Sequence, residues 1–142
     1  MEKVSDAAKT GSTEVCIQGG LLPDVGLDFY QEILESIKAE FPDMHIHAFS
    51  PLEITHGAST LNLSLGDFLK KLQLAGLNTL PGTAAEILDD AVRAKLCADK
   101  INTQQWVDVI STAHQVGLRT TSTIMFGHIE TPMSWARHLL IL

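Results

Sequence analysis

A pair of glycines stands directly after the first short apolar run of the chain, where a ligand could meet the backbone. The run covers residues 13–17, and Gln18, Gly19 and Gly20 follow it. Two glycines let a ligand approach closely and leave main-chain groups for hydrogen bonds, although taken alone the pair is explained better by a tight turn between strand and loop. The pair is neither a GxGxxG fingerprint nor a P-loop.

Two histidines form an HxH pattern in the second apolar run, residues 44–49. Because side chains alternate along a strand, His45 and His47 are expected on one face. That spacing suits zinc, and His128 and Glu130 could complete a metal hydrolase site on a barrel. The alternative, which the sequence favours, is that both histidines make hydrogen bonds in a cavity.

A carboxylate and an arginine follow the third apolar run. Glu86 comes just after a Pro-Gly-Thr turn and is expected near the start of a helical stretch over residues 84–96. There it would either cap the helix or bind a ribose hydroxyl or an ammonium group. Arg93 lies two helical turns further on and is expected on the same face, unless the two residues form only a surface ion pair.

The elements that must position these groups alternate along the chain. Strands are expected near residues 13–17, 44–49, 77–80 and 118–125, and helices over residues 27–40, 64–76 and 103–116. Ser64 and Thr103 are the expected N-caps, and Gly76 and Gly117 fit the left-handed position after a helix. Strands that alternate with helices indicate a parallel α/β sheet.

Each expected strand ends in a polar or glycine-rich cluster, which favours a (β/α) barrel over an open sheet with one switch point. One face of the strands is polar. Glu14, Cys16 and Gln18 share it in the first strand, and His45, His47 and Phe49 share it in the second. A barrel packed only for stability would place branched apolar residues there, so we expect a ligand cavity on this face.

Composition excludes several classes of protein. The chain has 142 residues, 45% apolar, and a net charge of −7 with no basic cluster. Disorder is therefore not expected, and neither is a nucleic-acid partner. No apolar run approaches the roughly 20 residues that span a bilayer, and the first residues do not form a secretory signal. We expect no membrane association and a cytoplasmic location, with Cys16 and Cys97 as buried thiols.

Three segments together carry a resemblance. Residues 44–53, 79–88 and 121–131 are similar to the FO synthase family, and within it to the tyrosine-using 4-hydroxyphenyl transferase half, which belongs to the radical S-adenosylmethionine (SAM) enzymes. The likeness runs from Val4 to Leu142. The related radical SAM enzymes of the futalosine route to menaquinone are the alternative. They typically have Gly-Gly-Gly-Ala-Glu where this chain has Gly-Thr-Ala-Ala-Glu at 82–86, which favours FO synthase.

The resemblance assigns roles to single residues. It implies that the amino group of SAM is held after the first strand of this chain and that its adenine is held by the segment that follows the fourth. The implied SAM-binding residues are Gln18, Gly19, Gly20, Glu86, Arg93, Thr123, Met125, Gly127 and Glu130. Thr123 and Met125 replace the first Gly and the Ile of the family's GxIxGxxE motif. The implied substrate-binding residues are His45, His47, Ser50, Glu53, Thr83 and His128.

The resemblance also implies cofactors and partners. A [4Fe–4S] cluster and SAM would generate a radical that fragments L-tyrosine, and the hydroxybenzyl piece would join 5-amino-6-(D-ribitylamino)uracil. A partner subunit or fused domain of FO synthase would then close the deazaflavin ring. These ligands are small molecules held by a protein that keeps water out.

One departure limits the resemblance. The family binds its cluster through CxxxCxxC, a motif that this chain lacks. The cysteine ligands of the cluster are therefore expected outside this chain, and no metal-binding residue is assigned within it. A whole barrel takes roughly 250 residues. We therefore expect residues 1–142 to be a fragment of a radical SAM core, about strands two to five of eight, inactive alone. A barrel metal hydrolase and a truncated, non-catalytic protein are the alternatives from other classes.

Overall fold

The computed structural model describes residues 1–21, 23 and 25–142. Strands alternate with helices, as expected, and a few helices are added between them. The elements run in the order α1 (Glu2–Lys9), β1 (Glu14–Ile17), α2 (Leu27–Glu40), β2 (His45–Ala48), α3 (Pro51–Thr60), α4 (Leu65–Ala75), β3 (Thr79–Leu80), α5 (Asp90–Leu96), α6 (Thr103–Gln115), β4 (Arg119–Thr120) and α7 (Pro132–Ile141).

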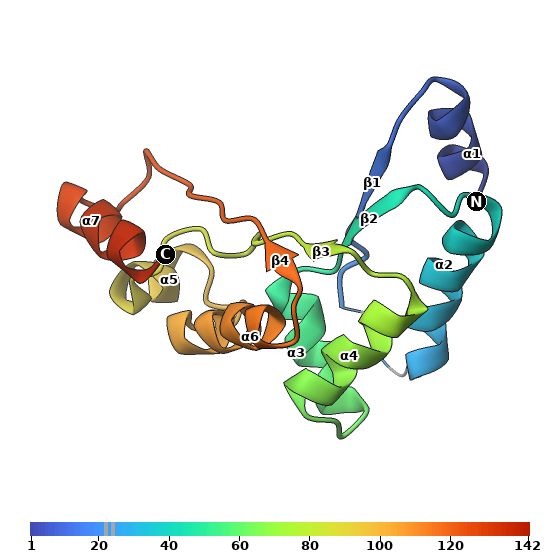
Figure 1. Cartoon of the computed structure of the whole chain (residues 1–142). Helices are drawn as coiled ribbons and strands as arrows, with labels where there is room; N and C mark the ends of the chain where they lie inside the picture. Colours follow the sequence, from blue (N-terminus) through green and yellow to red (C-terminus); the bar gives the residue numbers. More distant parts are fainter. Residues whose placement is uncertain (22, 24) are drawn as a thin grey trace.

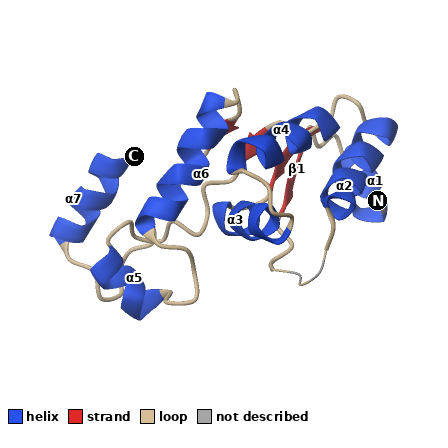
Figure 2. Cartoon of the chain, turned by 90° about the horizontal axis from the view of Figure 1, so that it is seen from below, coloured by secondary structure: helices blue, strands red, loops and turns tan. Residues whose placement is uncertain are grey.

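The strands form one parallel sheet in the order β1-β2-β3-β4. Val15 pairs with Ile46, His47 with Thr79, and Leu80 with Thr120. Figure 1 shows α2, α3, α4 and α6 together on one side of the strands, and Figure 2 shows these helices side by side from below. The expected parallel α/β architecture is confirmed, with β1 and β4 at the two edges of the sheet.

Apolar side chains from the sheet and from its helical cover form the main core. Ile46 and Leu80 from the strands, with Leu34, Phe68 and Val109 from the helices, are fully buried. Burial of this kind supplies the main free energy of folding, because each large side chain contributes roughly 1.5–3 kcal/mol. A smaller core joins the loop after β3 to α6. In the described part of the chain, no helix is long and apolar enough to cross a membrane.

Several helix ends follow the expected local rules. The Ser64 hydroxyl accepts a hydrogen bond from the Asp67 amide at 3.1 Å and begins α4. Gly76 ends the same helix with a φ of 117°, and Gly117 has a φ of 88°. Helix α2 ends at Glu40, just before Phe41 and a proline that cannot continue it.

Other expectations about the elements were wrong. The N-cap of α6 is Asn102, and Thr103 is its first residue. The expected helix over 84–96 begins only at Asp90, because the Asp89 side chain caps it by accepting from the Ala91 amide. Helix α3 was not foreseen, although Ser50 and Glu53 form a capping box with a proline between them.

Phe49 lies where the strand alternation did not place it, and the Cys16 thiol, which was expected to be buried, is exposed. Phe49 is buried, because a φ of 63° at the end of β2 turns its ring into the core against Tyr30. Cys16 is exposed on the polar face of β1, whereas Cys97 is buried as expected. Val15 and Ile17 pack against the core as the alternation predicts.

Candidate functional site

The carboxyl ends of the four parallel strands lie along one edge of the sheet, and the segments after them form the candidate site. We call this the carboxyl edge; its segments are residues 18–20, 49–53, 81–86 and 121–130. Three described residues other than glycine have a positive φ here: Phe49 at 63°, Ala84 at 59° and Glu86 at 47°. Backbone strain of this kind clusters where a fold holds a functional loop in place.

A buried carboxylate ties the end of β1 to the end of β2. One oxygen of Glu53, Oε1, accepts from the Gly19 amide at 2.7 Å, and Oε2 accepts from the Ser50 amide at 2.8 Å and the Ser50 hydroxyl at 2.7 Å. Glu53 is only 4% exposed. The Gly19 amide is thus engaged by the protein and is not left for a ligand, contrary to the sequence-based expectation. Gly20 has a φ of 76°, and no atom of the described residues lies within 4 Å of the position that a Cβ would take there.

The segments after β3 and β4 run in direct contact. The Gly82 amide donates to the Thr121 hydroxyl at 3.1 Å, and the Thr123 hydroxyl donates to the Gly82 carbonyl at 3.1 Å. Further along, the Met125 amide donates to the Glu86 carbonyl at 2.9 Å. These bonds bring the expected adenine-side residues Thr123 and Met125 beside the loop that carries Glu86.

Polar side chains also meet across the edge. The Thr83 hydroxyl donates to Gln18 Oε1 at 3.3 Å, although the two residues are 65 positions apart. The structure therefore brings together the glycine segment after β1 and the loop after β3.

The two histidines of β2 face away from the helices and share one partner. His45 Nε2 lies 2.8 Å and His47 Nδ1 lies 2.7 Å from the Thr79 hydroxyl of β3. Burial lowers the pKa of His47, which favours its neutral form. Within the described ranges no three His, Cys, Asp or Glu side chains are grouped to hold a metal ion. The hydrogen-bonding interpretation of the HxH pair thus fits the geometry.

Glu86 does not cap a helix. It lies in the loop between β3 and α5, and its carboxylate pairs with the Lys100 ammonium group. The capping alternative is wrong, since Asp89 performs that function.

Arg93 is neither a surface residue nor a partner of Glu86. Its guanidinium is 3% exposed and donates to the main-chain carbonyls of Ala84 and Ile87 at 3.2 and 3.4 Å, and also to those of Ala85 and Ile101. A guanidinium has five N–H donors, which suits it to collecting carbonyl groups. Arg93 and Glu86 do not share a helix face, because α5 begins at Asp90 and Glu86 lies in the loop before it.

Residues 127–130 form a turn that is closed by hydrogen bonds to the Glu130 carboxylate. Gly127 adopts a φ of 97°, which favours glycine, and its amide donates to the Glu130 carboxylate. The His128 amide donates to Glu130 Oε2 at 3.0 Å, and the Trp135 indole donates to Oε1 at 3.2 Å. Hydrogen bonds from the amides of Glu130 itself, Gly127 and His128 lower the pKa of Glu130 to about 2.

This turn is expected to resist acid. The turn lowers the pKa of the Glu130 carboxyl from its ordinary value of 4.5. The ionised carboxylate therefore stabilises the turn fully above pH 4.5, and this stabilisation is lost as the pH falls through about 2.

At neutral pH, Glu130→Gln should speed hydrogen exchange of the Gly127 and His128 amides, because one acceptor oxygen is replaced by a donor. Exchange measured by NMR checks this, with exposed Glu35→Gln as the control. Unchanged exchange in Glu130→Gln would contradict the assignment.

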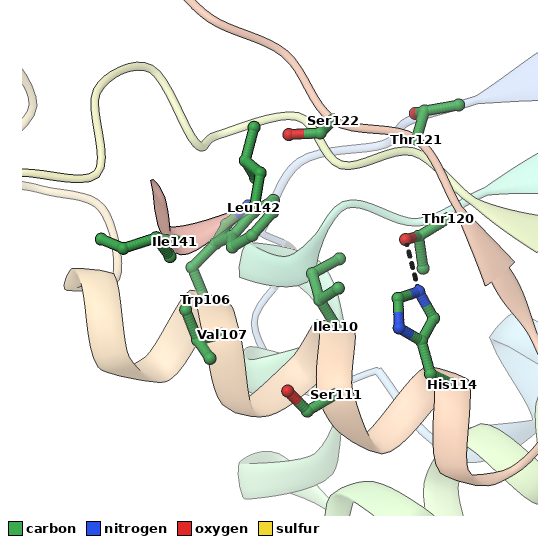
Figure 3. A pocket seen from close by; sticks show the side chains of 10 residues that line it. All are labelled: Trp106, Val107, Ile110, Ser111, His114, Thr120, Thr121, Ser122, Ile141 and Leu142. Carbon is green, nitrogen blue, oxygen red and sulfur yellow. Dashed lines mark hydrogen bonds between the residues drawn. The ribbon is translucent and has the colours of Figure 1, made fainter. Parts of the chain in front are cut away.

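A cavity of about 320 Å³ lies between α6, the end of β4 and the end of α7, and it meets the carboxyl edge only at Thr121 and Ser122. Figure 3 shows Trp106 and Ile110 on one side and His114 bonded to Thr120, with a separation of 2.9 Å. None of the residues expected to bind SAM or substrate lines it, so the candidate site is the carboxyl edge.

Four residues that hold the site in shape were not identified from the sequence as doing so. The Trp106 indole donates to the Thr83 carbonyl at 3.1 Å, and Trp135 holds Glu130. Lys100 pairs with Glu86, and His138 accepts from the Leu88 amide. Three of these contacts span between 14 and 50 positions, so spacing along the chain carries no signal for them, whereas Trp135 lies only five positions after Glu130.

The cysteines of this chain do not fit an iron–sulfur cluster. Cys16 is exposed on β1, whereas Cys97 is buried at the end of α5. With no third thiol in the chain, the usual set of cysteine ligands is incomplete.

Curated relatives match almost the whole chain. A 5-amino-6-(D-ribitylamino)uracil–L-tyrosine 4-hydroxyphenyl transferase of Methanosarcina barkeri is 58% identical over 99% of this chain and 37% of its own length. Proteins of the same name from Archaeoglobus fulgidus and Methanothermobacter thermautotrophicus are 51% and 49% identical, over 41% and 39% of their lengths. The chain thus spans well under half the length of these relatives.

The family profile of the radical SAM superfamily matches residues 1–141. Nearly the whole sheet and its helices lie inside this match, including the carboxyl edge. The chain belongs to the radical SAM superfamily.

Proposed function

We propose that this chain carries the SAM-binding edge of a 5-amino-6-(D-ribitylamino)uracil–L-tyrosine 4-hydroxyphenyl transferase, within a barrel of which it forms about strands two to five. The names of the curated relatives support the activity. The observation that carries the proposal is the convergence of residues 18–20, 82–86 and 123–130 at one edge of a parallel sheet. These are the segments that the family resemblance assigns to SAM.

The residues present fit SAM. Among the described residues nothing crowds the Cβ position of Gly20, and the carbonyl groups of the glycine segment can accept from an ammonium group. We assign Gln18, Gly19 and Gly20 to the amino group, and Glu86 to a hydroxyl or ammonium group. The turn that contains Gly127 and Glu130 would form the adenine side, together with Thr123 and Met125. Arg93 acts at a distance, because its guanidinium is buried among carbonyls.

The substrates would lie against the polar face of the sheet. His45 and His47 are half-buried there and can hydrogen-bond a phenol or a uracil carbonyl, and Thr83 and His128 flank them in our proposal. Ser50 and Glu53 are buried, so we assign them to holding the glycine segment rather than to substrate contact.

A bound [4Fe–4S] cluster would supply the electron that cleaves SAM. Because the cysteines of this chain do not fit it, its ligands are proposed to come from sequence outside residues 1–142, and a partner subunit or fused domain would complete the deazaflavin. The protein's own share is to bind, orient and exclude water.

The test is an anaerobic assay of the protein as its gene encodes it, with reductant, SAM, L-tyrosine and 5-amino-6-(D-ribitylamino)uracil. Mass spectrometry should detect the 4-hydroxybenzyl adduct of the uracil. SAM cleavage without this adduct would favour the menaquinone-route enzymes. No cleavage by a protein that holds its cluster would overturn the proposal.

A further inference from the structure

The loop that carries Glu86 is held in a strained conformation. Ala84 and Glu86 have φ values of 59° and 47°, in a region that residues with a Cβ rarely adopt. Residues 84–89 form neither helix nor strand. Something outside the loop must therefore offset the strain and keep Glu86 in place.

Arg93 is the first of two side chains that do so. It reaches back from α5 and donates to three carbonyls of the loop, those of Ala84, Ala85 and Ile87, and also to that of Ile101. One buried side chain thus fixes the direction of successive peptide groups on both sides of Glu86.

His138 is the second, and it comes from a different element. It lies on α7, is 0% exposed, and its Nδ1 accepts a hydrogen bond from the Leu88 amide at 3.0 Å. Figure 1 shows α7 beside α5, at the end of the chain far from the glycine segment. Burial and the nearby Arg93 charge lower the pKa of His138, so the ring stays neutral and keeps this acceptor.

The loop also connects directly to the adenine side. The Glu86 carbonyl accepts from the Met125 amide at 2.9 Å, and the Glu86 side chain is 19% exposed beside Lys100. A displaced loop would therefore move both Glu86 and the segment after β4.

We propose that His138 and Arg93 are positioning residues that act together as a latch on residues 84–88 and set the affinity for SAM through Glu86. The inference rests on the proposed function, since it assigns Glu86 to SAM. Neither side chain is assigned to SAM: the two terminal nitrogens of Arg93 donate to carbonyls, its Nε lies 4.0 Å from an Asp90 carboxylate oxygen, and His138 lies behind the loop.

Substitutions of His138 test the latch in the protein as its gene encodes it. His138→Leu removes the acceptor, whereas His138→Asn places an amide oxygen near the position of Nδ1. Ala136→Gly, at an exposed position of the same helix, is the control for a general weakening of α7. The measurements are the dissociation constant for SAM and hydrogen exchange of residues 84–88.

We expect His138→Leu to weaken SAM binding about tenfold and to speed exchange of the Leu88 amide about as much, the effect of one lost hydrogen bond to a buried amide. His138→Asn should restore both to within about threefold, by the same reasoning. Ala136→Gly should leave the dissociation constant for SAM unchanged and should not speed exchange of residues 84–88 more than exchange elsewhere. If His138→Leu does not fold, His138→Gln replaces it, because its longer side chain moves the acceptor away.

The possible failures are distinguishable. If the wild-type protein binds SAM and the latch variants bind it equally well, the latch inference is overturned and the proposed function stands. If the wild-type protein binds no SAM, the proposed function is wrong, and the inference about the latch, which rests on it, is wrong as well. Faster exchange without a change in affinity would reduce both residues to structural ones.

Discussion

Replacing Gly82 with alanine is expected to destabilise the protein by about 3–5 kcal/mol, at the upper end for a single substitution. A Cβ at this position would lie 1.8 Å from the Thr121 carbonyl oxygen and 3.0 Å from the Ser122 Cα. Both are backbone atoms, so no side chain can turn away. The two segments cannot separate either, since Gly82 bonds Thr121 and Thr123 through its amide and carbonyl groups.

The free energy of unfolding in urea measures this effect. Gly66→Ala in α4 is the matched control, because its Cβ would meet the Thr112 methyl of α6 at an ordinary 3.7 Å. A glycine-to-alanine change inside a helix is expected to stabilise by up to about 1 kcal/mol. Equal stability of the two variants would contradict the close contact between the segments after β3 and β4.

Replacing Glu53 with glutamine is expected to cost about 2–4 kcal/mol, because a buried acceptor for three hydrogen bonds becomes part donor. Whichever side the new amide nitrogen takes, it faces either the Gly19 amide or the two Ser50 donors. The end of β1 would then separate from the end of β2. The glycine segment would lose its fixed position, so affinity for SAM should fall as well.

Glu35→Gln on the exposed face of α2 makes the same chemical change without a buried partner and should cost less than about 0.5 kcal/mol. Urea unfolding compares the two variants, and SAM titration shows whether the glycine segment depends on Glu53. A Glu53→Gln variant as stable as wild type would mean that the carboxylate does not join the strands.

Much of this fold could be predicted from the sequence, by rules that depend only on neighbouring residues. The strand after each glycine or proline stop, the cap at Ser64 and the left-handed residues Gly76 and Gly117 all depend on neighbouring residues. The polar face of β2 followed from alternation alone, and the four strand ends indicated the candidate site. Signals of this kind span only a few positions, which is why they can be read directly.

The remaining features depend on contacts across the fold. Arg93 was expected beside Glu86 on one helix. That helix begins only at Asp90, because Asp89 caps it. The loop before the helix is held by His138, which is 50 positions from the Leu88 amide that donates to it. Glu53 was expected to face substrate, and its bond to Gly19 spans 34 positions. No spacing along the chain indicates such partners.

A titration of SAM into ¹⁵N-labelled protein tests whether SAM binds at the carboxyl edge of this sheet. We expect the amide resonances of Gly20, Glu86 and Gly127 to shift with a common dissociation constant, because these residues flank one site on three loops. Glu86→Gln should weaken that constant. Shifts confined to α1 and α2, or to the cavity beside α6, or no shifts at saturating SAM, would contradict it.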